Sequence, residues 1–195
     1  MHGGQSFGHE CSVTLSPHRM AAGDLPRAAQ LTEVWEHYRD RRLPNGLLPR
    51  SNVQMDMFSP ATLPWLALFD LTKQPGRILI RLWGGNLLNL GVVSPQGRFL
   101  DELIVPTLPQ LGQFYMGTVR LAEGGTPVYS EVTFDKPTGV RLLSRRLTVP
   151  VTLDGTSVAQ VLTCQAYDAP PDFRRDREPA SWNGSHRAVA WIVDC

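Results

Sequence analysis

In the first part of residues 77–103 every second position is apolar, and this pattern stops at two adjacent glycines. Every second residue from Ile78 to Leu82 is apolar, which predicts a strand with one apolar face. Gly84 and Gly85 end this strand, and the residues after them predict two short helical turns separated by a loop. A strand that breaks in this way leaves a gap over a sheet. The gap can hold a small apolar molecule, or side chains can fill it.

Four other segments have the pattern of strands. Residues 65–71 are almost continuously apolar, as in a strand buried on both faces, and a turn joins them to the strand at 77–83 as a hairpin. Three more segments alternate and are joined by turns, which predicts a meander; they are residues 128–134, 140–151 and 157–167.

An amphipathic helix is predicted near the N-terminus, with Asp24 as its cap and its end near Arg42. Leu31, Trp35 and Tyr38 share one stripe of this helix. The stripe fits packing on its own domain and also fits pairing with a second copy, so these three residues are the candidate dimer interface.

A second helix is predicted after residues 77–103. Thr107 and Gln110 form a capping-box pair at its start, and Gly124 with Gly125 supplies its C-terminal stop. The order of helices and strands therefore predicts an α+β fold, a five-stranded antiparallel sheet with helices on one face, preceded by the N-terminal amphipathic helix.

The 195 residues fit one domain with extensions. We expect a flexible tail at residues 1–23, the N-terminal helix at 24–46, the main domain at 47–168, and a linker and C-terminal tail at 169–195. Residues 188–193 are apolar enough either to add an edge strand or to contact a partner.

Composition removes several classes of function. The formal net charge of +1 gives no basic surface for nucleic acid. No run of residues approaches the roughly 18 apolar positions of a membrane span, and the N-terminus lacks the apolar region of a secretory signal. Three widely spaced cysteines fit neither a disulfide framework nor a zinc site, so we expect a cytoplasmic protein without a metal.

Several short motifs occur in an order and spacing that resemble a known family. They are residues 34–38, 48–51 with 58–64, 81–85, 97–103, and 146–151 with 154–155. Over about residues 27–168 the chain is similar to the bacterial PAS-type family of short, stand-alone sensory proteins. The resemblance implies a PAS-like fold and a role in signal transduction.

The chain departs from that family at the mouth of the gap. Gly85 stands where the family more often has Thr or Ser, and residues 92–96 replace a more polar loop. Gly97 occupies the place of the adduct-forming cysteine of the flavin-binding branch, and residues 38–185 contain no histidine to hold haem. We therefore expect neither an adduct-forming flavin nor His-ligated haem.

Candidate ligand-binding residues are the large side chains expected around the gap and one arginine; they are Phe69, Leu82, Trp83, Leu87, Leu90, Phe99, Tyr115, Val119 and Arg145. Arg145 lies in an otherwise apolar strand. It either points into the gap to pair with an anionic head group, or reaches solvent or pairs with Glu131.

These residues predict a sensory or regulatory module without catalytic activity. It would bind a small apolar or amphipathic ligand, form a homodimer, and signal to an unidentified protein. One alternative is an isomerase or hydratase on a cone-shaped α+β fold that uses Asp70 or Asp101 as a base. Another is an interaction protein with a filled core and no ligand.

Overall fold

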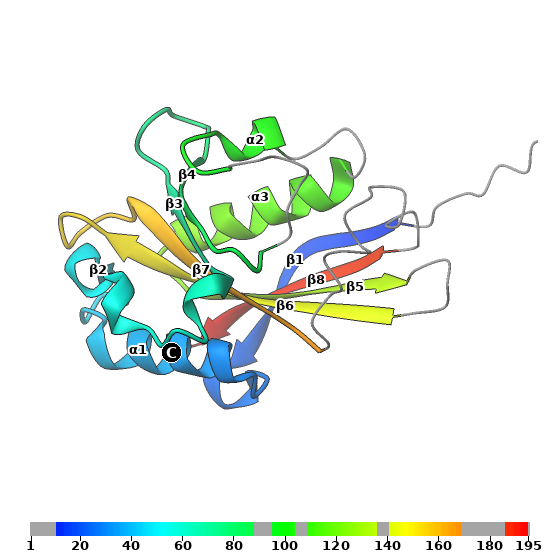
Figure 1. Ribbon diagram of the computed structural model, residues 1–195, viewed down its shortest axis with the longest axis horizontal. Helices are drawn as coiled ribbons and strands as arrows, with labels where there is room; N and C mark the ends of the chain where they lie inside the picture. Colours follow the sequence, from blue (N-terminus) through cyan, green and yellow to red (C-terminus); the bar gives the residue numbers. More distant parts are fainter. Residues whose placement is uncertain (1–10, 88–94, 104–108, 136–140, 169–185, 195) are drawn as a thin grey trace, which may run out of the picture.

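The structure of the protein is a computed structural model, and it describes residues 11–87, 95–103, 109–135, 141–168 and 186–194. Figure 1 shows a twisted sheet with helices packed against it. The strands are β1 (Cys11–Ala21), β2 (Leu48–Pro49), β3 (Leu66–Asp70), β4 (Leu79–Trp83), β5 (Val128–Asp135), β6 (Arg141–Thr152), β7 (Gln160–Tyr167) and β8 (His186–Asp194). The α-helices are α1 (Ala29–Arg41), α2 (Leu100–Leu103) and α3 (Pro109–Glu123). Short 3-10 helices are η1 (Ala22–Asp24), η2 (Arg50–Asn52), η3 (Met55–Met57) and η4 (Leu63–Trp65).

The sheet has eight strands and is mixed. Its order is β1-β8-β5-β6-β7-β3-β4, and β2 pairs with the end of β6. The β1–β8 and β2–β6 pairs are parallel, whereas the other pairs are antiparallel. β6 therefore lies in the middle of the sheet, where side chains on both of its faces are covered.

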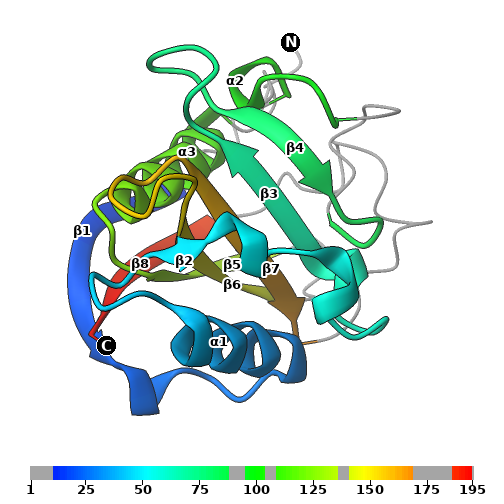
Figure 2. The ribbon, with the colours of Figure 1, turned by 90° about the vertical axis from the view of Figure 1, so that its left-hand side faces the viewer.

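Helices cover both faces, and Figure 2 shows α1 and α3 on opposite sides of the sheet. The α3-side core consists of apolar side chains from α3 and one face of the strands, among them Phe69, Ile80, Phe114, Val119, Val128, Val161 and Ala190. The α1-side core is built from α1 and the other face, among them Leu31, Val34, Tyr38, Leu68, Leu147, Val149 and Leu162. Because successive strand residues point to opposite faces, one strand supplies both cores.

The predicted five-stranded PAS-like sheet with helices on one face is wrong. All five predicted strands form, as β3 to β7, and β5-β6-β7-β3-β4 are neighbours in the observed order. Three further strands extend the sheet beyond them, two pairings are parallel, and α1 covers a second face. Local alternation predicts that a strand exists, but it does not reveal which distant segments pair with it.

Two of those extra strands come from the segments predicted as tails. Residues 11–21 form β1 instead of part of a flexible tail, and β8 lies between β1 and β5 instead of at an edge. Cys11 is the partner of His186 in the β1–β8 register. The two ends of the chain therefore stabilise one another, a relationship that neither segment reveals by itself.

The stripe predicted as a dimer interface packs within the chain. Leu31 and Tyr38 are buried in the α1-side core, and Trp35 is partly buried with its ring 5.5 Å from that of Tyr38. Of the two arrangements that the sequence left open, packing on its own domain accounts for Leu31 and Tyr38. Asp24 does not cap α1, since it ends η1 and Ala28 is the N-cap residue. A homodimer stays a prediction.

The strand break at the paired glycines has a steric cause. Gly84 is buried, and a Cβ atom at this position would lie 2.3 Å from the carbonyl oxygen of Pro64. Its N–H donates to the carbonyl of Leu66 at 2.8 Å. The end of β4 can approach this backbone because residue 84 has no side chain.

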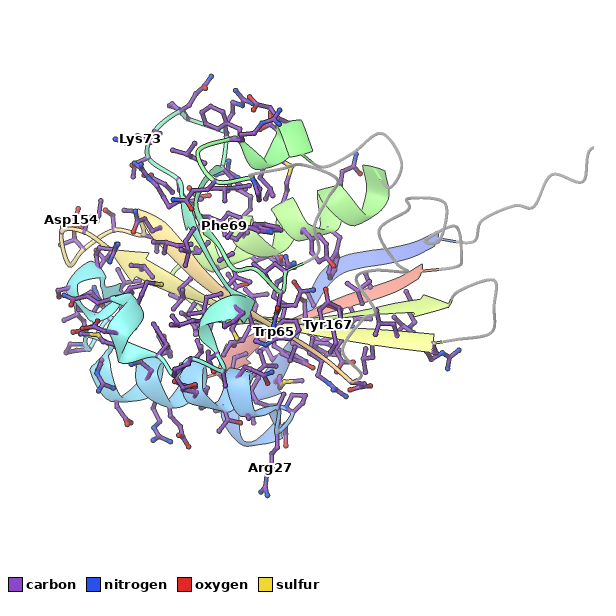
Figure 3. The ribbon with its side chains drawn as sticks, in the orientation of Figure 1. Arg27, Trp65, Phe69, Lys73, Asp154 and Tyr167 are labelled. Carbon is purple, nitrogen blue, oxygen red and sulfur yellow. The ribbon has the colours of Figure 1, made fainter. Side chains whose placement is uncertain are left out.

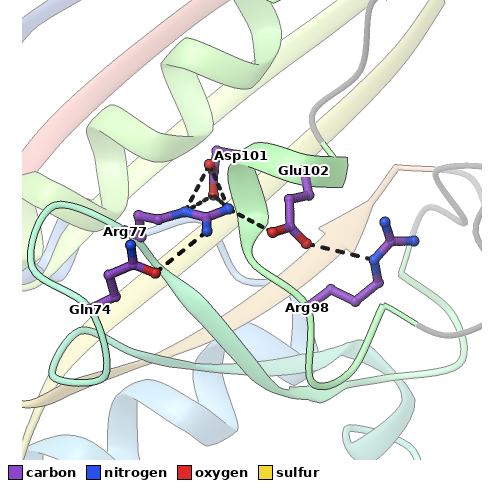
Figure 4. A network of polar contacts seen from close by, with 5 residues as sticks. All are labelled: Gln74, Arg77, Arg98, Asp101 and Glu102. Carbon is purple, nitrogen blue, oxygen red and sulfur yellow. Dashed lines mark hydrogen bonds and ion pairs between the residues drawn. The ribbon is translucent and has the colours of Figure 1, made fainter.

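A polar network fixes the turn between β3 and β4 to α2. Figure 4 shows Arg77 between Gln74 of that turn and the two acidic residues of α2. Arg77 donates to Asp101 at 3.0 Å and to Glu102 at 2.7 Å, and its guanidinium lies 3.8 Å from the centre of the Phe99 ring.

Among the helices that the structure describes, none is long and apolar enough to cross a membrane.

Candidate functional site

A group of polar side chains lies on the α3 face at the centre of the sheet. Alternate residues of a strand share a face, and Leu142 of β6 belongs to the α3-side core. Ser144, Arg146 and Thr148 therefore point to this face as well. In the strand register, Arg146 lies between Ser130 of β5 and Gln165 of β7. All of these polar residues are buried. Buried polar groups in the middle of a sheet usually satisfy one another, so their partners decide what this group does.

Arg146 is the central residue of this group. Only 8% of its surface is exposed. Its Nη2 donates to Oε1 of Gln165 at 3.2 Å, whereas its buried Nε has no hydrogen-bond partner among the residues that the structure describes. No described carboxylate lies within ion-pair distance of its guanidinium. A buried arginine without a counter-charge is rare, because removing a charge from water costs several kcal/mol.

Tyr115 of α3 covers the guanidinium of Arg146 from above. The centre of its ring lies 3.8 Å from the guanidinium carbon, which is a cation–π contact. The Tyr115 hydroxyl is also buried and has no hydrogen-bond partner within the described ranges. Two polar groups of this cluster therefore retain unused hydrogen-bonding capacity.

Gln165 links Arg146 to Tyr167, the last residue of β7. Its Nε2 donates to the hydroxyls of Ser144 and Tyr167, both at 2.7 Å. The amide orientation leaves Oε1 facing Arg146. We refer to Tyr115, Ser144, Arg146, Gln165 and Tyr167 as the Arg146 cluster.

The electrostatics of the cluster follow from its burial. Burial lowers the pKa of Arg146 from its ordinary value, because the charged form is poorly solvated there. Burial raises the pKa of Tyr115 and of Tyr167, so both phenols are neutral at physiological pH. Arg146 thus supplies one positive charge in a dry, mostly neutral environment, where it interacts more strongly with an anion than it would in water.

Arg145, the arginine predicted to enter the gap, lies on the other face. It pairs with Glu131 at 3.5 Å and donates a hydrogen bond to Asp168. Burial acts to lower the pKa of Arg145, but the hydrogen bond to Asp168 and the charges of Asp168 and Glu131 together outweigh burial and raise it. Of the arrangements that the sequence left open for Arg145, the pairing with Glu131 is confirmed. A contact between Arg145 and a ligand stays a prediction.

The structure brings some of the other predicted ligand-binding residues together. Five of them belong to or pack against the α3-side core; they are Phe69, Trp83, Leu87, Tyr115 and Val119. The rings of Phe69 and Trp83 meet edge-on, with centroids 6.5 Å apart. Leu82 packs against the α1-side core instead, and Phe99 lies under Arg77. Leu90 lies outside the described residues.

The carboxylates that a catalytic function would use are both engaged. Asp70 is 3% exposed and accepts hydrogen bonds from Arg81 at 2.8 Å and from Thr72 at 2.7 Å. Burial acts to raise the pKa of Asp70, but these hydrogen bonds outweigh it and lower the pKa. Asp101 is held by Arg77. Within the described residues, no group of three or more His, Cys, Asp and Glu side chains is placed to hold a metal.

A second feature is an open groove with a volume of about 520 Å³ at the C-terminal end of α1. Its lining comes from the end of α1, the loop after it and the start of β5; the residues are Tyr38, Arg39, Arg42, Leu43, Pro44, Asn45, Gly46, Gly125, Thr126 and Pro127. Arg39 is paired with Asp40 at 2.9 Å, and Arg42 lies over the Tyr38 ring. Because the groove is open to solvent and both of its arginines already have a partner, the Arg146 cluster is the stronger candidate for a specific site.

Sequence reasoning missed Arg146, although a usable signal was present. Residues 142, 144, 146 and 148 of β6 share a face on which three of four side chains are polar. That pattern is unusual for a central strand, whose faces are both buried.

Comparison with known proteins adds no further residue, since no profile of a protein family, no characterised protein and no solved structure matched this chain.

Proposed function

We propose that this protein is a sensory or regulatory module that binds a small molecule between α3 and the sheet. The observation that supports this proposal most directly is the unsatisfied polar capacity at Arg146 Nε and the Tyr115 hydroxyl. An unpartnered buried donor destabilises a fold by about 1–3 kcal/mol, and a bound molecule with a suitable acceptor would remove that penalty.

The surroundings of the cluster favour an amphipathic ligand. Tyr115 and Tyr167 are only partly buried, pack against the α3-side core and contact the buried polar groups. Aromatic walls with a few convergent polar groups are the usual composition of small-molecule sites. Because Asp70 and Asp101 are already held by arginines, the arrangement favours recognition over acid–base chemistry.

A continuous set of contacts leads from this cluster to α1 on the opposite face. Tyr167 accepts a hydrogen bond from Gln165, and its ring lies 5.7 Å from that of Trp65. Figure 3 shows these two aromatic residues next to each other at the end of β7. Tyr167 packs against both cores, so a change at its hydroxyl can affect either face.

Trp65 continues the path toward α1. It ends η4, and its N–H donates to the carbonyl of Thr62 at 2.9 Å. The Thr62 hydroxyl donates to Glu33 of α1 at 2.5 Å, and Glu33 also accepts from Ser59. Ligand occupancy would thus alter how firmly α1 is held, and a signalling partner would read that difference.

Native mass spectrometry of the purified protein tests the binding part of this proposal. A mass retained under native conditions and lost on denaturation is the expected result. Hydrogen exchange of the loaded protein and of protein stripped on a hydrophobic resin then tests the path to α1. We expect faster exchange in α1 after stripping, with a smaller difference in Tyr167→Phe, which lacks the hydroxyl that accepts from Gln165.

Two results would contradict the proposal. The first is a protein that retains no mass and whose exchange is unchanged by the resin, which would favour an interaction protein with a filled core. The second is retention of a molecule with identical α1 exchange in the loaded and stripped forms, which would remove the regulatory part.

A further inference from the structure

We infer that the molecule bound at the Arg146 cluster is an apolar monocarboxylic acid, with its carboxylate paired to Arg146 and its hydrocarbon part against the α3-side core. This inference rests on the proposed small-molecule site and names the chemical class that the site selects.

The first argument is the missing counter-charge. Glu131 and Asp168 are both paired with Arg145 on the other face. Asp70 is taken by Arg81. Arg146 therefore has no protein carboxylate in the described part of the chain, and a buried cation is stable only with a partner of opposite charge. An anion from outside the protein would supply the counter-charge that the described carboxylates do not.

The second argument is the geometry of the free donors. Tyr115 covers one face of the guanidinium, so new hydrogen bonds form at its edge. Gln165 uses one N–H of Nη2, whereas Nε–H is buried and unused. A carboxylate fits such an edge because its two oxygens accept from Nε–H and one terminal N–H in parallel.

The third argument is the number of charges. The other polar members of the cluster are neutral, namely Ser144, Gln165 and the two tyrosines. One cation in an apolar environment balances one negative charge, and a dianion would bury an uncompensated charge. The neighbouring side chains, among them Val128 and Val132, are apolar and favour a hydrocarbon tail.

The experiment compares acids with their uncharged amides. Octanoate and 4-phenylbutyrate are titrated into stripped protein beside octanamide and 4-phenylbutyramide, with binding followed by tryptophan fluorescence and calorimetry. We expect the acids to bind more tightly than the amides by a factor on the order of tenfold to hundredfold. Any molecule that co-purifies is extracted and identified by mass spectrometry, and we expect a monocarboxylic acid.

Three variants test whether the preference for acids over amides depends on Arg146. Arg146→Met should remove the difference between acid and amide, whereas Arg145→Met, its neighbour on the other face, should keep it. Arg146→Lys keeps the charge but lacks the Nε–H edge, so it should bind the acids more weakly than the wild type and still prefer them to the amides. This second variant keeps the test valid if Arg146→Met does not fold.

The outcomes separate this inference from the proposed function. A neutral co-purified molecule, or equal affinity for acid and amide in the wild type, would overturn the carboxylate assignment and leave the binding function intact. The absence of any co-purified mass, together with no binding of either acid, would overturn both. An acid preference that persists in Arg146→Met would place the anion elsewhere and overturn the assignment to Arg146.

Discussion

Arg145 and Arg146 are consecutive residues of β6, and their guanidinium groups lie on opposite faces of the sheet. Arg145 pairs with Glu131 and Asp168 on the α1 face, whereas Arg146 lies under Tyr115 on the α3 face. One arginine is therefore balanced by carboxylates of the chain, and among the residues described here the other is not. Two consecutive arginines of one strand thus differ in whether a described carboxylate balances their charge.

Replacing Arg145 or Arg146 by Met should therefore change the stability of the ligand-free protein in opposite directions. Arg146→Met removes a buried charge at similar volume, so the free energy of unfolding should rise by about 1 kcal/mol. Arg145→Met removes a partly exposed ion pair and should lower the free energy of unfolding by about 0.5–1 kcal/mol. Urea unfolding of stripped protein measures both changes. A loss of about 3 kcal/mol or more in Arg146→Met would show that Arg146 is a structural residue.

Local patterns in the sequence were sufficient for the individual elements. The strands β3 to β7 and the helices α1 and α3 follow from alternation, helical periodicity and the glycines at 124 and 125. The pairing of β1 with β8 depends on segments at opposite ends of the chain, and neither has a partner in its own neighbourhood. The wrong fold class came from those two segments and from the unpredicted second helical layer.

The Arg146 cluster could not be predicted for a related reason. Because alternate residues of a strand share a face, the sequence places Arg145 on the same face as Leu147 and Val149, and the structure confirms this. This alternation does not show which face meets which helix, because that depends on where α1 and α3 pack. The predicted ligand-binding residues therefore fall on both faces: Tyr115 and Val119 lie with Arg146 on the α3 face, whereas Arg145 lies on the α1 face.

Gly84 and Gly85 provide a matched pair for testing the break at the end of β4. A Cβ atom at residue 84 would lie 2.3 Å from the Pro64 carbonyl oxygen, whereas no atom lies within 4 Å of one at residue 85. Gly84→Ala should therefore lower the free energy of unfolding by about 1–3 kcal/mol, since the Pro64 backbone must move. Gly85→Ala should change it by less than about 0.5 kcal/mol. Equal effects of the two substitutions in urea unfolding would refute the steric explanation.

Arg77 is predicted to hold α2 against the turn between β3 and β4. Arg77→Ala removes hydrogen bonds to Asp101 and Glu102, so amide exchange in α2 should become faster. Because these groups are partly exposed, about 1 M salt should produce part of the same effect in the wild type. Arg98→Ala is the control, since its Nε is 3.8 Å from Glu102 and outside hydrogen-bond distance. Comparable exchange in both variants would argue against a specific role for Arg77.

Glu33 is predicted to make the attachment of α1 sensitive to acid. Burial acts to raise the pKa of Glu33, but hydrogen bonds from Thr62 and Ser59 outweigh it and lower the pKa below its ordinary value of 4.5. The folded state therefore releases this proton more readily than the unfolded state. The stabilisation is complete above about pH 4.5 and is lost as the pH falls through the lower pKa of the folded state.

Glu33→Gln tests this linkage. The amide replaces one acceptor oxygen with a donor, so at neutral pH the variant should be less stable by about 1–3 kcal/mol. The difference from the wild type should shrink as the pH falls below about 4.5, because the wild-type carboxyl then also becomes neutral. Glu36→Gln, an exposed position in the same helix, should follow the wild-type profile. Unfolding curves at several pH values measure this difference, and a gap between Glu33→Gln and wild type that stays constant down to pH ~3 would contradict the assigned shift.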